Sequence, residues 1–237
     1  MRTTHRYQPP VHQGLDLLYV DSDLVIVNKP AGLLSVPGRG EDKQDSMLHR
    51  LQTEYPDAQT VHRLDMDTSG ILLFARNADT QRAMSRLFEQ RRIYKAYLAR
   101  VWGVPKETRG SINLPLIADW PNRPRQKIDF TLGKPALTHY QLLTVNQQHS
   151  LIQLYPVTGR SHQLRLHMSA LGHPILGDPL YGTAMSRCAS PRLLLHAEQL
   201  RFEHPFTGKP VNLQCQAEFA LGKLAAARSA EEKVNSI

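Results

Sequence analysis

The segment Val61-His62-Arg63-Leu64-Asp65-Met66-Asp67-Thr68-Ser69-Gly70-Ile71-Leu72-Leu73-Phe74-Ala75 joins a charged loop to an uninterrupted apolar run. The apolar run predicts a buried strand, and the turn-forming residues before it lead the chain into that strand. A loop at the end of a rigid strand can aim a side chain such as Asp65 at a substrate. The alternative is a solvated turn in which Arg63 and Asp65 pair locally.

Length and composition describe an ordinary globular chain with an excess of positive charge. The 237 residues are 41% hydrophobic, which is enough for a large core in one domain or two small ones. The net charge of +8 favours a polyanionic partner, of which nucleic acid is the commonest. A solvated basic surface would give the same net charge, so charge alone does not decide.

Cysteine content and hydropathy bear on the compartment. Cys188 and Cys215 are the only cysteines, too few for a disulfide framework or a zinc cluster, and they fit a reducing cytoplasm. Residues 1–14 lack the apolar core of a signal peptide, and no apolar run approaches the roughly 20 residues of a membrane helix. We therefore expect a cytoplasmic protein without a membrane partner.

Hydrophobic periodicity predicts an alternation of strands and helices. Helices are expected near 46–55, 78–91 and 161–171, with Asp45 or Ser46, Asn77 and Ser161 as their N-caps. Leu193 to Ala197 indicates a buried strand or a helix edge, and residues 103–136 carry few periodic signals. Strands are expected at 15–20, 24–27, 71–76, 94–102, 136–145, 150–156, 199–203 and 210–215.

Two further stretches have the composition of an RNA-binding surface. The loop 28–38 contains two prolines, and its Lys29 is a candidate phosphate contact, although a lone lysine is more often plain surface. The piece from Asp119 to Lys127 combines a tryptophan, two prolines and three cations, which suits contact with RNA or a basic surface hairpin. Its candidate contacts are Trp120, Arg123, Arg125 and Lys127.

Several of these segments resemble, in the right order, the motifs of the RluA family of RNA pseudouridine synthases. His62-Arg63-Leu64-Asp65 with Thr68-Ser69-Gly70 resembles the signature that carries the family's catalytic Asp. Asn28-Lys29-Pro30-Ala31-Gly32, Lys95-Ala96-Tyr97 and the segment 159–165 resemble the first, second and third motifs. The segment 177–182 is also similar to the family.

The resemblance runs from about residue 18 to residue 218 and implies the fold. It predicts an α+β pseudouridine synthase fold, with a bent, mainly antiparallel mixed sheet flanked by helices and a central active-site cleft. We expect an N-terminal arm at 1–14, one catalytic domain at 15–220 and a C-terminal tail at 221–237. The arm is too short for the S4-type RNA-binding module of some relatives.

The implied reaction is the isomerisation of uridine to pseudouridine within RNA, which requires no cofactor and no metal. The resemblance makes Asp65 the catalytic carboxylate, Arg165 its cationic partner and Tyr97 the residue that packs against the target base. Tyr97 could instead be an ordinary core residue of its strand. Arg63 is expected to fill or brace the site that the flipped base vacates. Asp65 could attack C1′ of the ribose or remove a 2′ proton, and the sequence does not choose between them.

The implied partner is RNA, and the resemblance extends to a family member that modifies both 23S ribosomal RNA and tRNA. We expect stem-loops of 23S rRNA and the tRNA anticodon stem-loop as substrates, a monomeric enzyme, and further RNA contacts from Arg160 and His162. The alternatives are a non-catalytic RNA-binding protein and an RNA N-glycosidase that releases the base.

Two other kinds of site are disfavoured by spacing. His162, His167 and His173 are five and six residues apart, so no two share a helical face, and no metal site is expected. Asp67 is expected to point away from Asp65, which makes a glycosidase with paired carboxylates the weaker hypothesis.

Overall fold

The structure is a computed structural model that describes residues 7–220, and the predicted tail at 221–237 lies outside these residues. The helices are α1 (Met47–Gln52), α2 (Ala78–Glu89), α3 (Gln163–Ala170) and α4 (Ala184–Cys188), with 3₁₀ turns η1 (Glu41–Lys43) and η2 (Trp120–Asn122). The strands are β1 (Leu17–Val20), β2 (Leu24–Lys29), β3 (Gln59–Thr60), β4 (Ser69–Ala75), β5 (Tyr94–Trp102), β6 (Arg109–Asn113), β7 (Leu116–Ala118), β8 (Gln126–Ile128), β9 (Leu137–Asn146), β10 (His149–Pro156), β11 (Leu195–Glu203) and β12 (Pro210–Gln214).

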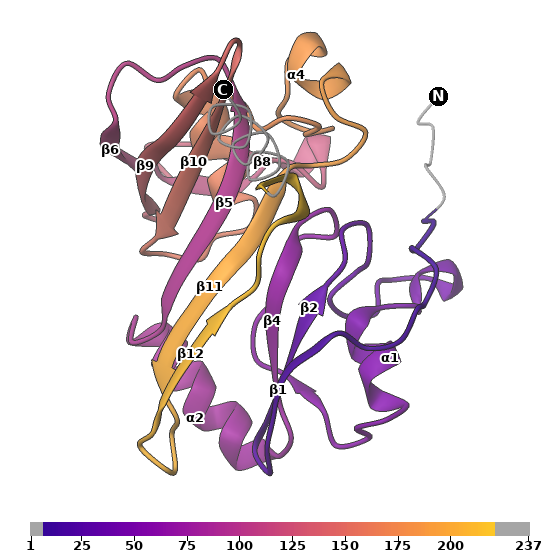
Figure 1. Ribbon diagram of the computed structural model, residues 1–237. Coiled ribbons are helices and arrows are strands. Elements are labelled where there is room, and N and C mark those ends of the chain that lie inside the picture. Colours follow the sequence, from indigo (N-terminus) through magenta and orange to yellow (C-terminus); the bar gives the residue numbers. More distant parts are fainter. Residues whose placement is uncertain (1–6, 221–237) are drawn as a thin grey trace, which may run out of the picture.

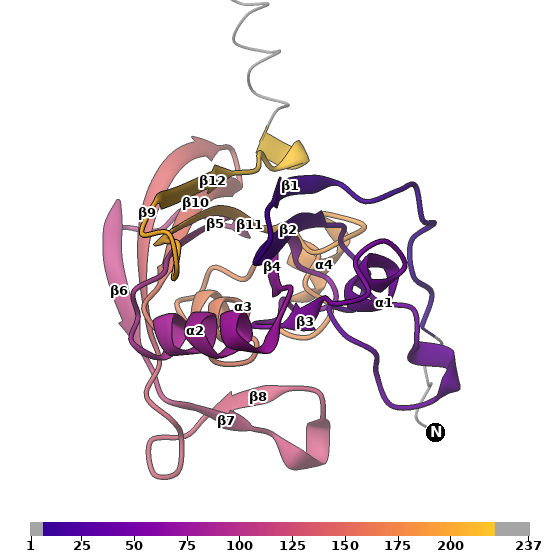
Figure 2. The same ribbon diagram turned by 90° about the horizontal axis from the view of Figure 1, so that it is seen from below.

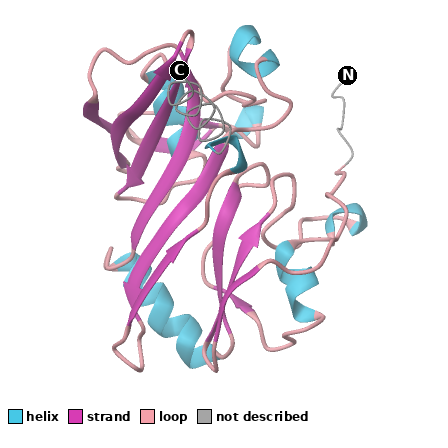
Figure 3. Cartoon of the chain, in the orientation of Figure 1, coloured by secondary structure: helices cyan, strands magenta, loops and turns pink. Residues whose placement is uncertain are grey.

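One long, twisted sheet organises the chain (Figure 1, Figure 3). Its strand order is β1-β2-β4-β11-β5-β10-β9-β6, with β3 paired to β4 and β12 paired to β11. Every pairing is antiparallel except the short parallel contact of β4 with β11. The predicted α+β fold with a mixed, mainly antiparallel sheet is therefore confirmed.

The helices α2 and α3 lie on the same face of this sheet (Figure 2). The side chain of Asn77 caps α2 by accepting from the backbone N–H of Thr80, as its position before the helix predicts. Met84 and Leu87 of α2 then pack into a core cluster with Leu24 and Leu73 of the sheet. The small hairpin of β7 and β8 stands apart from the main sheet on the side of these helices (Figure 2).

The contact of β4 with β11 depends on a glycine at the end of the charged loop. Gly70 has φ 109°, and a Cβ there would lie 2.3 Å from the carbonyl oxygen of Ala197. Only glycine allows this approach of the two backbones without displacement. Gly70 thereby joins the loop that carries Asp65 to the strand at the centre of the sheet.

Three expectations about the elements are corrected. The expected cap of α3 was Ser161, but the helix begins at Gln163, and His162 takes the N-cap position with φ 54° and no capping side chain. The Gln163 side chain instead accepts from the backbone N–H of Arg160. The segments 193–197 and 199–203 were expected as separate elements, but a single strand, β11, runs unbroken from 195 to 203. The region 103–136 contains three strands, whose brevity hides their periodicity.

Two other features concern the surface. None of the helices in the described part of the chain is long and apolar enough to cross a membrane.

Residues 7–14 of the predicted arm have no regular structure, but they dock against the region of α1. The Tyr7 hydroxyl donates to the carbonyl of Asp45, and the Arg50 guanidinium of α1 donates to the carbonyl of Pro10.

Candidate active site

The loop that carries Asp65 is fastened to the loop after β2. The hydroxyl of Ser35 donates to the carbonyl of Leu64 and accepts from its backbone N–H, at 2.8 and 3.0 Å. The backbone N–H of Gly32 donates to the carbonyl of Met66 at 2.9 Å. These bonds on either side of Asp65 fix its backbone, so the segment 28–35 holds the loop in place.

Lys29 is part of the segment that holds this loop, and its predicted contact with RNA phosphate is wrong. Its side chain is fully buried, and its ammonium donates to the carbonyls of Pro30, Leu33 and Met66 at 2.7 to 3.0 Å. A lysine has three donors, so none remains for a phosphate. Burial lowers the pKa of Lys29 to about 7, although the negative charges of Asp67 and Asp65 act to raise it.

The carboxylate of Asp65 contacts the guanidinium of Arg165, which α3 carries. Nη1 of Arg165 lies 3.3 Å from Oδ2 of Asp65, although the two residues are 100 positions apart in the chain. Asp65 is partly exposed, whereas Arg165 is only 2% exposed. The expected pairing of these two residues is confirmed.

Asp178, which the sequence did not single out as a site residue, holds Arg165 in place. Its carboxylate accepts from Nε and Nη2 of Arg165 at 2.8 and 2.7 Å, a bidentate arrangement, and both side chains are buried. The Asp178 carboxylate also accepts from the backbone N–H groups of Leu180 and Tyr181. The guanidinium can therefore present only its remaining edge, with Nη1, to Asp65.

Electrostatics keep this pair ionised. Burial acts to raise the pKa of Asp178, but the hydrogen bonds and charge of Arg165 and the two backbone donors outweigh it, and the pKa is lowered. Burial likewise acts to lower the pKa of Arg165, but the charges of Asp178, Asp65 and Asp67 raise it on balance. Arg165 is thus a permanent cation beside Asp65.

Asp67 is close enough to Arg165 and Lys29 for their charges to act on its pKa. Burial raises the pKa of Asp67, and the charges of Arg165 and Lys29 act in the opposite direction. No hydrogen bond joins its carboxylate to a described side chain. Asp67 is therefore a neighbour of the site, and it cannot serve as an uninvolved control for Asp65.

A narrow cavity brings six of the predicted residues together. Its volume is about 100 Å³. Its lining includes the three predicted catalytic residues, Asp65, Tyr97 and Arg165, and three of the predicted RNA contacts, Arg63, Arg160 and His162. Arg63 and Arg160 are exposed, whereas His162 is mostly buried. The cavity is smaller than the roughly 300–1,000 Å³ of ordinary small-molecule sites.

Tyr97 projects from β5 into this cavity. Its hydroxyl makes no hydrogen bond within the described part of the chain. Burial and the charge of Asp65 raise its pKa, so the phenol is protonated at neutral pH. It offers an aromatic surface and a free hydroxyl beside the carboxylate.

Tyr181 connects the cavity to the β7–β8 hairpin. Its hydroxyl accepts from the backbone N–H of Gln126 at 2.7 Å and shares a hydrogen bond with Nδ1 of His162 at 2.8 Å. The Arg165 guanidinium lies 5.5 Å from the centre of its ring. Tyr181 and Asp178 both fall in the segment 177–182, so its resemblance to the family was the one available signal for them.

The hairpin itself carries the remaining predicted RNA contacts. Trp120 is 66% exposed, and the Arg123 guanidinium lies 3.4 Å from the centre of its ring. Lys127 pairs with Asp129 at 3.2 Å, and Arg125 is exposed. None of these four residues lines the cavity that contains Asp65. They form a separate surface joined to it through Gln126 and Tyr181.

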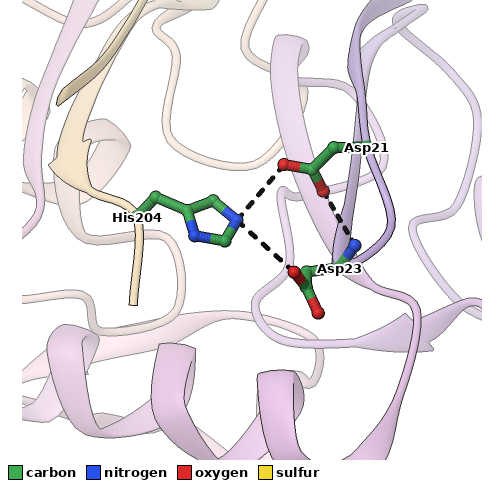
Figure 4. A group of neighbouring side chains, drawn as sticks. All are labelled: Asp21, Asp23 and His204. Carbon is green, nitrogen blue, oxygen red and sulfur yellow. Dashed lines mark hydrogen bonds and ion pairs between the residues drawn. The ribbon is translucent and has the colours of Figure 1, made fainter. Parts of the chain in front are cut away.

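Among residues 7–220, one group of side chains is close enough to be considered as a metal site. Asp21 and Asp23, in the β1–β2 turn, face Nε2 of His204, at the end of β11, at 3.2 and 3.9 Å (Figure 4). Nδ1 of His204 accepts from the backbone N–H groups of Phe206 and Thr207, so the proton of the neutral ring is on Nε2. A ligating histidine instead donates from its second nitrogen. The group is better suited to linking the two turns than to holding a metal.

Comparison with known proteins adds to this geometry. Residues 23–170 match the family model described as RNA pseudouridylate synthase, which covers more than half of the chain. The chain belongs to the RNA pseudouridylate synthase family. The synthase is thus an isomerase that converts uridine to pseudouridine in RNA, and this family membership does not favour the two alternatives, a non-catalytic RNA-binding protein and an N-glycosidase.

Similar proteins agree with this assignment over most of the synthase. It is 49% identical over 214 residues to the dual-specificity RNA pseudouridine synthase RluA of Escherichia coli strain K12, covering 90% of this chain and 98% of the relative. Its identity to the protein of the same name from Vibrio parahaemolyticus is 50% over 204 residues, covering 84% of this chain and 82% of the relative.

Solved structures show the same fold. Human RNA pseudouridylate synthase domain containing 1 superposes with a TM-score of 0.73 at 32% identity, covering 88% of the synthase and 86% of the human chain. Human RNA pseudouridylate synthase domain containing 4 gives 0.68 at 26% identity, covering 90% and 92%.

Proposed function

We propose that this enzyme isomerises specific uridines in two kinds of RNA, a stem-loop of 23S rRNA and the anticodon stem-loop of tRNA. The support is the sequence resemblance to a family member with these substrates, together with relatives named as dual-specificity synthases. The observation that carries the chemistry is the contact of Asp65 with Arg165 in a cavity lined by Tyr97.

We assign the reacting carboxylate to Asp65. In one route an oxygen of Asp65 bonds to C1′ as the N1–C1′ bond breaks, the uracil turns, and C5 then bonds to C1′ and frees the carboxylate. In the other route Asp65 removes the 2′ proton as the N1–C1′ bond breaks, which gives a glycal, and the proton returns to C2′ when C5 bonds to C1′. Both routes need an ionised, aimed carboxylate, and Arg165 supplies the fixed charge beside it.

Tyr97 and Arg63 act on the base. Tyr97 stacks on the uracil, and its hydroxyl, which has no hydrogen bond within the described part of the chain, is available when C5 loses its proton. Arg63, exposed at the mouth of the cavity, braces the place that the flipped base leaves. The side chains of Arg63 and Arg160, which line the cavity, are exposed and so accessible to an incoming RNA.

The RNA backbone is held by cations outside the cavity. Arg160 lies at its edge, and Arg123, Arg125 and Lys127 extend the positive surface along the hairpin, where Trp120 offers an exposed ring. The buried position of His162 gives it contact with the target nucleotide rather than with the backbone. We further propose a cytoplasmic, monomeric enzyme with a single catalytic domain at 15–220.

The test is release of tritium from 5-tritiated uridine in the two stem-loop RNAs. Isomerisation releases tritium and keeps the base attached, cleavage releases free uracil, and binding alone does neither. Asp65→Asn keeps the shape of the side chain and removes its charge, so we expect RNA binding without tritium release. Asp79→Asn, on the exposed start of α2, is the matched control and should be fully active. Full activity of Asp65→Asn would refute the assignment, and turnover of only one RNA would refute dual specificity.

A further inference from the structure

A second and larger cavity lies next to the one that contains Asp65. Its volume is about 500 Å³, which is within the range of small-molecule sites. Residues from the end of α2, from β5 and from β10 line it. Lys95 and Pro156 line both cavities, so the two share a wall.

Aromatic side chains form part of the second cavity. Tyr94, the first residue of β5, is 42% exposed, although Ile93 just before the strand is buried. Its ring lies 6.2 Å from that of Tyr155, and the Arg201 guanidinium lies 5.0 Å from its centre. An exposed tyrosine braced by a cation is a stacking surface for a base, because every base has a π-face.

The cations around this cavity outnumber the acids that face them. Arg91 and Arg92 are exposed in the turn after α2, and the Arg92 charge is shared with Glu203 at 3.1 Å. Arg91 has no ion pair within the described part of the chain. Glu198 is near Tyr155, but burial raises its pKa, and it accepts a hydrogen bond from Gln153. The balance suits an anion such as a phosphate.

Lys95 occupies the wall between the two cavities. Its ammonium has no hydrogen bond or ion pair with any described residue, and its neighbour there is the ring of Phe88, at 5.7 Å from the ring centre. Burial lowers its pKa. A half-buried cation without an anionic partner, placed between two sites, is well suited to a bridging phosphodiester.

We propose that the second cavity holds a nucleotide that flanks the target uridine in the same RNA strand. Its base stacks on Tyr94, beside Tyr155, and the phosphate between the two nucleotides lies against Lys95. The inference rests on the proposed function, because the first cavity must hold the uridine. It assigns the enzyme a second base-binding pocket, through which RNA sequence or loop shape next to the target contributes to recognition.

The experiment is a scan of stem-loop RNAs with one abasic nucleotide at each position near a 5-tritiated target uridine. One flanking abasic position should lower kcat/KM of the wild-type enzyme by about 5- to 150-fold, the range of base–aromatic stacking, mainly through KM. In Tyr94→Ala the intact RNA should suffer a similar loss, and the same abasic position should cost nothing more. Tyr94→Phe keeps the ring and should behave as wild type, and so should Arg82→Ala, on the exposed face of α2.

Three results would overturn the proposal: no sensitive flanking position in the wild type, an equal abasic penalty in wild type and Tyr94→Ala, or normal use of intact RNA by Tyr94→Ala. Circular dichroism of each variant verifies folding. The same RNAs are also titrated against Asp65→Asn, with and without Tyr94→Ala, and scored by binding alone. That comparison tests the pocket even if the wild-type enzyme released no tritium, which would be a failure of the proposed function instead.

Discussion

Asp178→Asn tests whether the position of Arg165 is set by a second carboxylate. The substitution keeps the shape of the side chain and one oxygen, which can still accept from the backbone N–H groups of Leu180 and Tyr181. It removes the negative charge and turns one end of the bidentate contact into a donor that faces Arg165. Asp178 is fully buried and so does not contact RNA itself.

The expected magnitude follows from that burial. Removing one partner of a buried ion pair typically costs about 3–5 kcal/mol of unfolding free energy. We expect about 3 kcal/mol, the lower end of this range, because Arg165 keeps Asp65 as a counter-ion at 3.3 Å. Since the guanidinium is then held only by the reacting carboxylate, both lose their fixed geometry, and a misplacement on the scale of 1 Å costs about 100-fold in rate.

The assay combines urea denaturation with tritium release from a stem-loop RNA. We expect a lower urea midpoint and a lower kcat, with KM little changed. A double variant, Arg165→Met with Asp178→Leu, separates the two roles. An apolar pair of similar volume should recover most of the stability, yet it should have no activity.

A change in stability of less than about 0.5 kcal/mol in Asp178→Asn, as for a surface substitution, would refute the structural role of the buried pair. An unchanged kcat in a variant that had lost stability would refute the positioning role of Asp178. The first result would mean that the pair contributes no net stabilisation, and the second that the aim of Arg165 does not depend on it.

Three further perturbations test other parts of the site. Lys29→Met leaves the carbonyls of Pro30 and Leu33 without this donor, whereas that of Met66 keeps the backbone N–H of Gly32, so we expect a loss of about 2 kcal/mol or more in urea denaturation, and an unchanged midpoint would contradict the structural role. Burial lowers the pKa of His62 from 6.5 to about 3. Between these values only the unfolded chain takes the proton, so stability should fall as pH drops through this window, by up to about 1.4 kcal/mol per unit. His62→Gln should make urea midpoints at pH 7 and pH 4.5 differ less than in the wild type, and an identical difference would refute this. Replacing Arg123, Arg125 and Lys127 with Gln should weaken RNA binding and flatten its salt dependence, with little effect on the turnover of bound RNA; an unchanged salt slope would show that the hairpin does not contact phosphates.

The sequence alone determined the elements with strong local periodicity and the chemistry of the motifs. The apolar run after Gly70 had to be a buried strand, and the Asn77 cap with the 3.6-residue spacing of Met84 and Leu87 had to give α2. These signals lie within a few residues of one another, so no tertiary information is needed to detect them. The motifs around Asp65, Tyr97 and Arg165 indicated the family and the reaction in the same local way.

Only the tertiary structure decided which charges meet. Lys29 looked like a surface cation, but its partner Met66 is 37 residues away, and the carbonyls around it exclude it from RNA. The pKa of Asp67 responds to its burial and to Arg165, nearly 100 positions along the chain, which no local pattern indicates. Asp178 had no visible role until the fold placed it on Arg165. Burial and long-range pairing depend on how segments as far as 100 residues apart come together, and local sequence patterns carry no information about that arrangement.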